Sequence, residues 1–160
     1  MNKFLSCHLL RGVFVALILS LTACYNAAVL PDSVKAKALL SLPPSNKSYI
    51  YLIREKRAQG AFDSWCFTID NEITGFINNG TFVVAEVNPG KHQLLYGLPG
   101  NNGSCVLKSE NARTELNSIP GKIYYYLLWS GINLLSGSEG KRYLDQPSVK
   151  MLESSRITLP

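Results

Sequence analysis

The sequence predicts an all-β fold, an antiparallel β-sandwich or partly open barrel of about seven to eight short strands. Short segments rich in β-branched and aromatic residues recur at near-regular intervals from Ser48 onwards. Turn-forming combinations of Asn, Pro and Gly separate these segments. No long segment of helical periodicity follows residue 45, so residues 48–160 are expected to form the β-sandwich domain.

The individual strands differ in how they are expected to be buried. Residues 48–54 are apolar nearly throughout, which is typical of a well-buried strand, whereas 63–70 alternates, with Trp65, Phe67 and Ile69 on one face. Further strands are expected at 73–77, 81–87, 91–96, 105–107 and 123–129, with a last one at 149–152 that Pro147 would confine to an edge.

Four turns are expected between these strands. Asp70-Asn71-Glu72 forms a turn, and Asn78-Asn79-Gly80 is a strong hairpin signal because Asn and Gly tolerate positive φ. Pro-Gly pairs reverse the chain at 88–90 and at 120–122, since proline presets φ and glycine accepts the positive φ that follows.

The N-terminal segment reads as a secretory signal peptide, residues 1–23. Lys3 and Arg11 lead into an apolar run, which ends in Leu21-Thr22-Ala23-Cys24. This order resembles the bacterial lipoprotein signal, in which the cysteine is acylated and becomes the first mature residue. The alternatives are an ordinary signal peptide followed by a structural cysteine, and an uncleaved span; the latter has only 12 residues from Gly12 to Ala23, against about 20 needed to cross a bilayer.

The resemblance implies that the mature chain is a lipid-anchored protein of the bacterial cell envelope. Tyr25, where enteric lipoproteins of the inner membrane carry Asp, implies the outer membrane and a domain that faces the periplasm. Residues 24–47 are expected to form the lipidated tether. A short helix starting at Asp32 or Ser33 and ending at Pro43-Pro44 would be either loosely docked or part of a flexible stalk.

The charge pattern argues against nucleic acid as a partner. Removing the signal leaves 14 basic and 11 acidic residues, scattered without the basic stripe that a nucleic-acid surface needs.

The cysteine content predicts a disulfide. Cys66 and Cys105 are expected to form a disulfide in an oxidising compartment, with free thiols or a metal site as alternatives. Because His92 is the one histidine of the mature chain, neither a metal site nor a cofactor is expected.

Four segments in this order resemble the bacterial lipoprotein family known as domain of unknown function 2846. They match its Tyr-x-Tyr-x-x-Arg, Asp-Gly-x-x-x-Gly, Pro-Gly-x-His and Gly-x-x-Tyr-Tyr motifs and lie at Tyr49–Arg54, Ile69–Gly75, Val87–His92 and Ile119–Tyr125. Asn71 stands where the family has a turn glycine. The resemblance covers about residues 47–129 and implies a β fold, without an established activity.

His92 is the candidate catalytic base, and the residues around it do not complete a catalytic site. A nucleophilic enzyme needs a neighbouring Ser or Cys and an orienting carboxylate, and no serine lies in a Gly-x-Ser-x-Gly elbow. We therefore expect His92 to hydrogen-bond its own turn, and no enzymatic activity. A hydrolase remains an alternative only if His92 lies in a pocket beside a nucleophile.

The expected function is a structural or protein-interaction module of the envelope, with a glycan- or peptidoglycan-binding module as the alternative. Two candidate contact surfaces follow from the sequence. Tyr124 and Tyr126 share one strand face and are either partly exposed or buried in a strand covered on both sides. Ile132, Leu134 and Leu135 lie in the segment 130–138, which either meets a partner or caps the sandwich, in the latter case also as a short helix.

Overall fold

The computed structural model describes residues 28–60, 62–101 and 103–154. The predicted all-β, sandwich-like fold is confirmed, with ten strands in two sheets that do not close into a barrel within these residues. The strands are β1 (Ser48–Arg54), β2 (Trp65–Ile69), β3 (Glu72–Ile77), β4 (Thr81–Val87), β5 (Gly90–Pro99), β6 (Cys105–Leu107), β7 (Arg113–Ser118), β8 (Ile123–Leu128), β9 (Ile132–Leu135) and β10 (Lys150–Met151). The helices are α2 (Asp32–Leu40), a 3₁₀ turn (Glu110–Ala112) and α3 (Gly137–Leu144).

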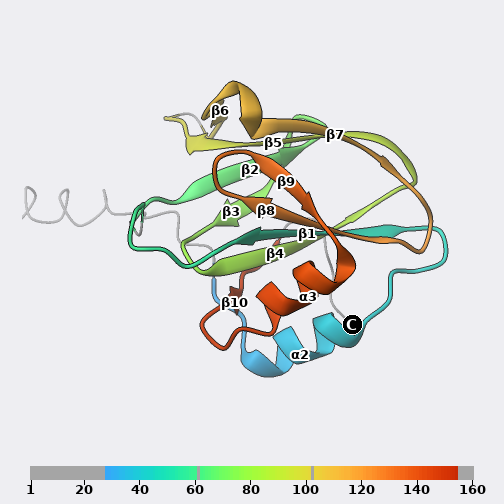
Figure 1. The fold of residues 1–160 in the computed structure, drawn as a ribbon. Helices are drawn as coiled ribbons and strands as arrows, with labels where there is room; N and C mark the ends of the chain where they lie inside the picture. Colours follow the sequence, from blue (N-terminus) through green and yellow to red (C-terminus); the bar gives the residue numbers. More distant parts are fainter. Residues whose placement is uncertain (1–27, 61, 102, 155–160) are drawn as a thin grey trace, which may run out of the picture.

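The domain has three layers, because helices cover the outer face of one sheet (Figure 1). The first sheet has the order β10-β4-β1-β8-β9; the second has β3-β2-β5-β6, with β7 also paired to β5. Apolar side chains between the sheets form the inter-sheet core, which includes Ile50, Phe67 and Leu94. A second cluster, the helix-side core, lies between the first sheet and the helices and includes Tyr51 and Leu144.

Strand β1 is buried along its whole length because it contributes to both cores. This confirms the prediction of a well-buried strand at 48–54, and it explains why the segment is apolar nearly throughout rather than alternating. The same arrangement applies to β8, whose side chains enter the two cores in turn.

The strand order corrects three expectations. The fold is not purely antiparallel, because β1 pairs with β8 and β10 with β4 in parallel. The segment Asn78-Asn79-Gly80 does not close a hairpin; it leads from β3 in one sheet to β4 in the other. The reversal at 88–90 likewise changes sheets, from β4 to β5. The tight hairpin turn is at Asp70 and Asn71, whose φ angles are 56° and 66°, as the type I′ geometry requires.

Two strands were not predicted. The sequence of β7, Arg113–Ser118, carries a single aliphatic side chain, Leu116, since the strand lies at an edge and buries little. The other is β9, which follows β8 through a short turn and ends its sheet. The expected last strand is present as β10, at the opposite edge of that sheet.

The expected helix in the tether is present as α2 and docks on the sheet. Ala38 is buried in the helix-side core, and its carbonyl oxygen accepts a hydrogen bond of 3.1 Å from the Tyr51 hydroxyl. The N-cap residue is Pro31, not Asp32 or Ser33. Ahead of the helix, Val29 forms an isolated β-bridge with Leu152. Residues before 48 therefore pack against the β-sandwich.

The predicted signal peptide and Cys24 lie outside the described residues. Among the helices that are described, none has the length and apolar character needed to cross a membrane.

The predicted disulfide between Cys66 and Cys105 is present, with Cα atoms 5.7 Å apart. It joins β2 to β6 across the intervening β5. In β5, a Cβ atom at Gly97 would lie 1.8 Å from the backbone oxygen of Val106, so only glycine fits this close approach. The bridge therefore clamps the end of the second sheet where β2 begins.

Candidate functional site

Two polar clusters lie at the opposite ends of β2. Trp65 starts the strand and Asp70 follows its last residue. The four residues between them place the two clusters about 17 Å apart along an extended strand. They differ in one respect that bears on function, namely whether their buried polar atoms have partners.

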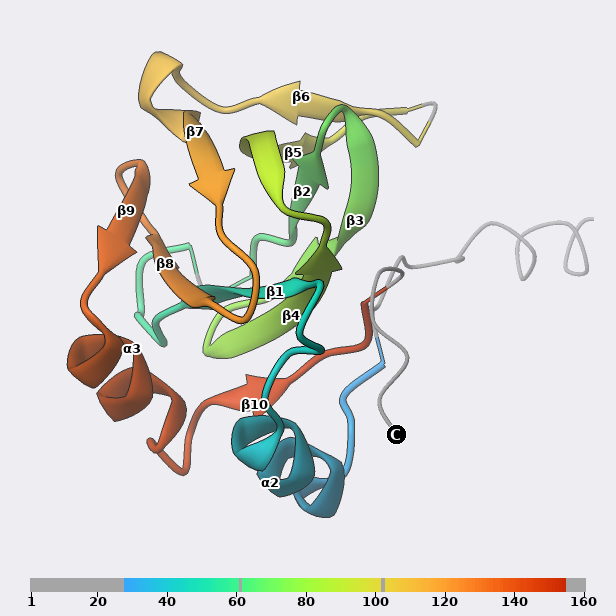
Figure 2. The ribbon, with the colours of Figure 1, turned by 90° about the vertical axis from the view of Figure 1, so that its right-hand side faces the viewer.

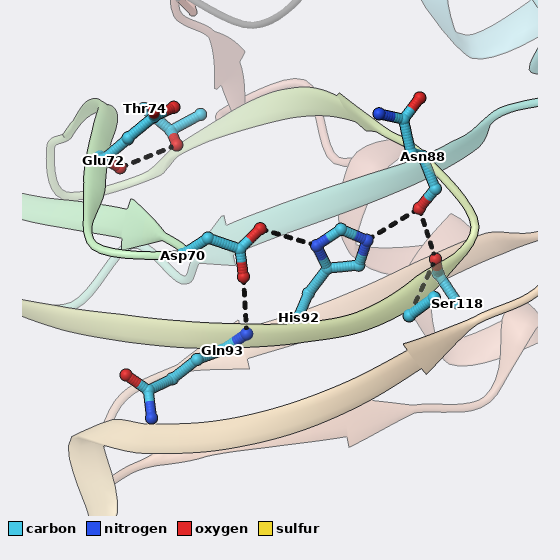
Figure 3. A network of polar contacts seen from close by, with 8 residues as sticks. Asp70, Glu72, Thr74, Asn88, His92, Gln93 and Ser118 are labelled. Carbon is cyan, nitrogen blue, oxygen red and sulfur yellow. Dashed lines mark hydrogen bonds and ion pairs between the residues drawn. The ribbon is translucent and has the colours of Figure 1, made fainter.

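The cluster at Asp70 is built around His92 and links two turns that lie between strands (Figure 3). The Nδ1 atom of His92 lies 2.7 Å from a carboxylate oxygen of Asp70, and Nε2 lies 2.7 Å from the backbone oxygen of Asn88. The other Asp70 oxygen accepts a hydrogen bond from the Gln93 backbone N–H, and the Asn88 oxygen accepts a second one from the Ser118 hydroxyl.

This geometry confirms that His92 hydrogen-bonds its own turn. Because both partners of the ring are acceptors, both contacts are hydrogen bonds at once only when both ring nitrogens carry hydrogen. Neither nitrogen contacts a Ser or Cys side chain. The network holds the turns after β2 and β4 against the start of β5, which is a structural role.

A hollow of about 560 Å³ opens beside this network, lined by residues of β5, β7 and the β2–β3 turn. Its charged side chains are of mixed sign, Lys91 against Glu115 and Asp70, and no Phe, Tyr or Trp lines it. The polar atoms of His92 and Asp70 are already used within the protein. It therefore offers little to fix a ligand.

The cluster at the other end of β2 is built around Arg54, the last residue of β1, which is 1% exposed. Its guanidinium donates hydrogen bonds to the backbone oxygens of Gly60, Asp63 and Ile77, at 2.6, 2.5 and 3.4 Å. These bonds tie the β1–β2 loop to the strand end. Burial lowers the pKa of Arg54, and the nearby Asp63 carboxylate partly opposes this.

Trp65 carries two cations on its indole ring. The Arg54 guanidinium lies 3.8 Å from the ring centroid and the Lys108 ammonium 3.7 Å from it. Burial lowers the pKa of Lys108, the charge of Arg54 lowers it further, and Asp63 raises it. Within the described residues, neither cation forms an ion pair with a carboxylate.

Three buried polar atoms in this cluster have no hydrogen-bond partner: Arg54 Nε, Trp65 Nε1 and the Ser64 hydroxyl oxygen. Buried polar groups are normally satisfied, so three orphans in one place call for an explanation. Beside them lies a hollow of about 300 Å³, which we name the tryptophan hollow. Its lining residues are Gln59, Gly60, Asp63, Trp65, Lys108, Trp129 and Ser130.

The predicted tyrosine surface is wrong for Tyr126, which is 3% exposed and lies in the inter-sheet core. Burial raises its pKa to about 12, with a smaller contribution from Tyr124. Tyr124 is partly buried against the same core, and its hydroxyl accepts a hydrogen bond from the Ile119 backbone N–H. The alternative, a strand covered on both faces, describes β8.

The segment 130–138 supplies β9 and the start of α3 instead of an isolated loop. Ile132 packs against the inter-sheet core and Leu135 against the helix-side core. Leu134, between them, is 63% exposed. Of the five candidate partner residues, Leu134 is the one with its side chain mostly in solvent.

Neither metal-binding groups nor known relatives indicate a function. Within the described residues, no group of three or more His, Cys, Asp or Glu side chains could hold a metal ion. No protein-family model matches the chain, and no curated protein matches it either. The resemblance to domain of unknown function 2846 therefore stays a prediction.

Proposed function

We propose that this chain is a lipid-anchored lipoprotein of the bacterial envelope, a non-enzymatic module that binds another envelope protein through the open edge of β9. The observation that carries the proposal is Leu134, a large aliphatic side chain that is 63% exposed on an edge strand. The signal that ends at Cys24 supports the lipid anchor, and Tyr25 after it supports the outer membrane and a domain facing the periplasm.

The anchor would hold the domain close to the lipid surface. Ala28, whose carbonyl oxygen accepts a hydrogen bond from Glu153, follows Cys24 by four residues. Four extended residues span at most about 14 Å. A lipid on Cys24 would therefore keep the first residues of the fold within that distance of the membrane, and any protein partner must be reached there.

Metabolic labelling with palmitate tests the anchor. The wild-type chain should incorporate the label and the Cys24→Ala variant should not, because the thiol is the acylation site. Cys7→Ala is the matched control, since that cysteine lies within the predicted signal and should leave labelling unchanged. Equal labelling of wild type and Cys24→Ala would end the lipoprotein proposal.

The proposed docking mode is addition of an extended segment to the edge of the sheet. Among the described strands, β9 pairs only with β8, so the backbone on its other side is available for pairing. An added strand would also cover Leu134.

Crosslinking in native membranes tests this surface. Leu134→Asp should abolish the crosslinked adduct seen with wild type, because a carboxylate cannot be buried in the contact, while the melting temperature changes little. Leu98→Asp is the matched control, as Leu98 is also exposed but lies on the second sheet. A large loss of stability in Leu134→Asp would place this side chain in the core and remove the proposed site.

A further inference from the structure

We propose that the tryptophan hollow is a binding site for an acidic sugar, a pyranose that carries a carboxylate. This inference goes beyond the protein-interaction module and does not depend on the surface at Leu134. The charges around the hollow, its lining residues and its volume support the proposal.

The hollow has an excess of positive charge. Lys108 lines it, and Arg54 lies directly behind Trp65. Asp63 is the one acidic residue of the lining, so two cations face a single carboxylate. Lys108 is exposed, and the charge of the buried Arg54 lowers its pKa across the Trp65 ring, so both cations would attract an anion placed beside Lys108. The carboxylate of the ligand is therefore expected at the Lys108 ammonium.

The remaining lining residues suit the ring and hydroxyl groups of a sugar. Trp129, which is partly exposed, provides an aromatic wall against which the C–H groups of a pyranose pack. Trp65 lies beneath Arg54 and Lys108 and is 1% exposed, so it supports the hollow without contacting the sugar ring. Gln59, Asp63 and Ser130 provide polar groups for sugar hydroxyls. No described residue donates a hydrogen bond to the Asp63 carboxylate or to the Gln59 amide, so both are available to a ligand.

The size of the hollow limits the ligand. At about 300 Å³ it lies at the lower end of the usual range for small-molecule sites, about 300–1,000 Å³. It therefore accommodates one sugar ring rather than a long chain. Two kinds of carboxylate-bearing sugar occur in a bacterial envelope: the N-acetylmuramic acid of the cell wall and the uronic acids of surface polysaccharides.

Intrinsic fluorescence reports on this site directly, because Trp65 and Trp129 are the two tryptophans of the sequence and both line the hollow. The full-length chain in a non-ionic detergent is titrated with N-acetylmuramic acid and with glucuronic acid. Their neutral counterparts, N-acetylglucosamine and glucose, are the matched controls. We expect saturable changes with both acids, at dissociation constants at least tenfold below those of the neutral sugars. The acid that binds more tightly identifies the source.

Variants then test the role of each charge. Lys108→Gln should weaken binding of the acids about tenfold, the loss expected for one charge-assisted hydrogen bond, and leave the neutral sugars unaffected. Asp63→Asn should strengthen binding of the acids, because it removes the opposing charge. Lys91→Gln is the matched control and should change nothing, since Lys91 lines the other hollow.

Three results would overturn the proposal. The first is the absence of a saturable change with either acid. The second is equal binding of acidic and neutral sugars, or an unchanged affinity in Lys108→Gln. The third is an equal response to inorganic phosphate at the same concentrations, which would make the hollow a general anion site. None of these results bears on the crosslinking at Leu134, so the two proposals fail separately.

Discussion

At the two ends of β2, a turn or loop is held against the strands by polar networks that differ in how completely they are satisfied. Each end ties a turn or loop to the strands with a basic side chain, His92 at one end and Arg54 at the other. At the His92 end the ring nitrogens and both Asp70 oxygens have partners. At the Arg54 end three buried polar atoms have none, and a hollow adjoins them.

This difference separates a structural network from the proposed binding site. A fully satisfied cluster has no unused donors or acceptors, so it stabilises the turns and offers nothing to a ligand. A cluster with orphaned buried polar atoms and excess positive charge is not fully satisfied within the protein, and the proposed ligand beside Lys108 would offset the charge. The larger hollow lies at the satisfied end and the smaller one at the unsatisfied end, so the proposed site is not selected by volume.

The disulfide should have the largest effect on stability, and it supports the Arg54 end. The double variant Cys66→Ala/Cys105→Ala should lose about 2–5 kcal/mol in the free energy of unfolding, because the bridge closes a long loop. Urea unfolding measures this loss, with reduced wild type as the control. A loss below about 1 kcal/mol would show that the strand pairing alone holds β6 in place.

Arg54→Met should cause the second-largest loss in the free energy of unfolding. It removes the donor from three backbone oxygens, those of Gly60, Asp63 and Ile77, and should cost about 3 kcal/mol in urea unfolding. Arg57→Met is the matched control, an exposed arginine whose guanidinium lies 4.4 Å from the Trp129 ring centroid. That control should cost less than about 1 kcal/mol. Equal losses would mean that the loop is not held by Arg54.

His92→Ala should have the smallest effect of the three, about 1–2 kcal/mol, through the loss of two hydrogen bonds at the other end of β2. The tryptophan response to acidic sugars should be unchanged, because the hollow lies at the opposite end of the strand. Lys91→Ala, next to it and exposed, serves as the control. A changed sugar response in His92→Ala would show that the two ends are coupled.

The sequence predicted much of the fold and little of the site. Strand positions follow from short-range patterns, and all eight predicted strands are present, three with the predicted ends (48–54, 81–87 and 105–107) and five with shifted ends. The hairpin expected at 78–80 shows the limit, since a turn residue with positive φ, such as Gly80 at 71°, reverses the chain locally. It does not determine whether the next strand pairs with the previous one or crosses to another sheet.

The Arg54 site was missed because its members are distant in sequence. Its members lie at or directly after the ends of four different strands: Arg54 in β1, Trp65 in β2, Lys108 after β6 and Trp129 after β8. One signal is present, an arginine that ends an apolar strand, but a strand pattern does not indicate whether the side chain at its end is buried. His92 was easier to predict, because its partner Asn88 is only four residues away.

The sequence by itself determined the all-β class, the cysteine pair and the turn contact of His92, because each depends on local periodicity, on residue count or on neighbours in the chain. The tertiary structure alone decided the parallel pairing of β1 with β8, the burial of Tyr126 and the assembly of the tryptophan hollow. These depend on which sheet each strand joins, and that choice follows from burying apolar faces of the whole domain together.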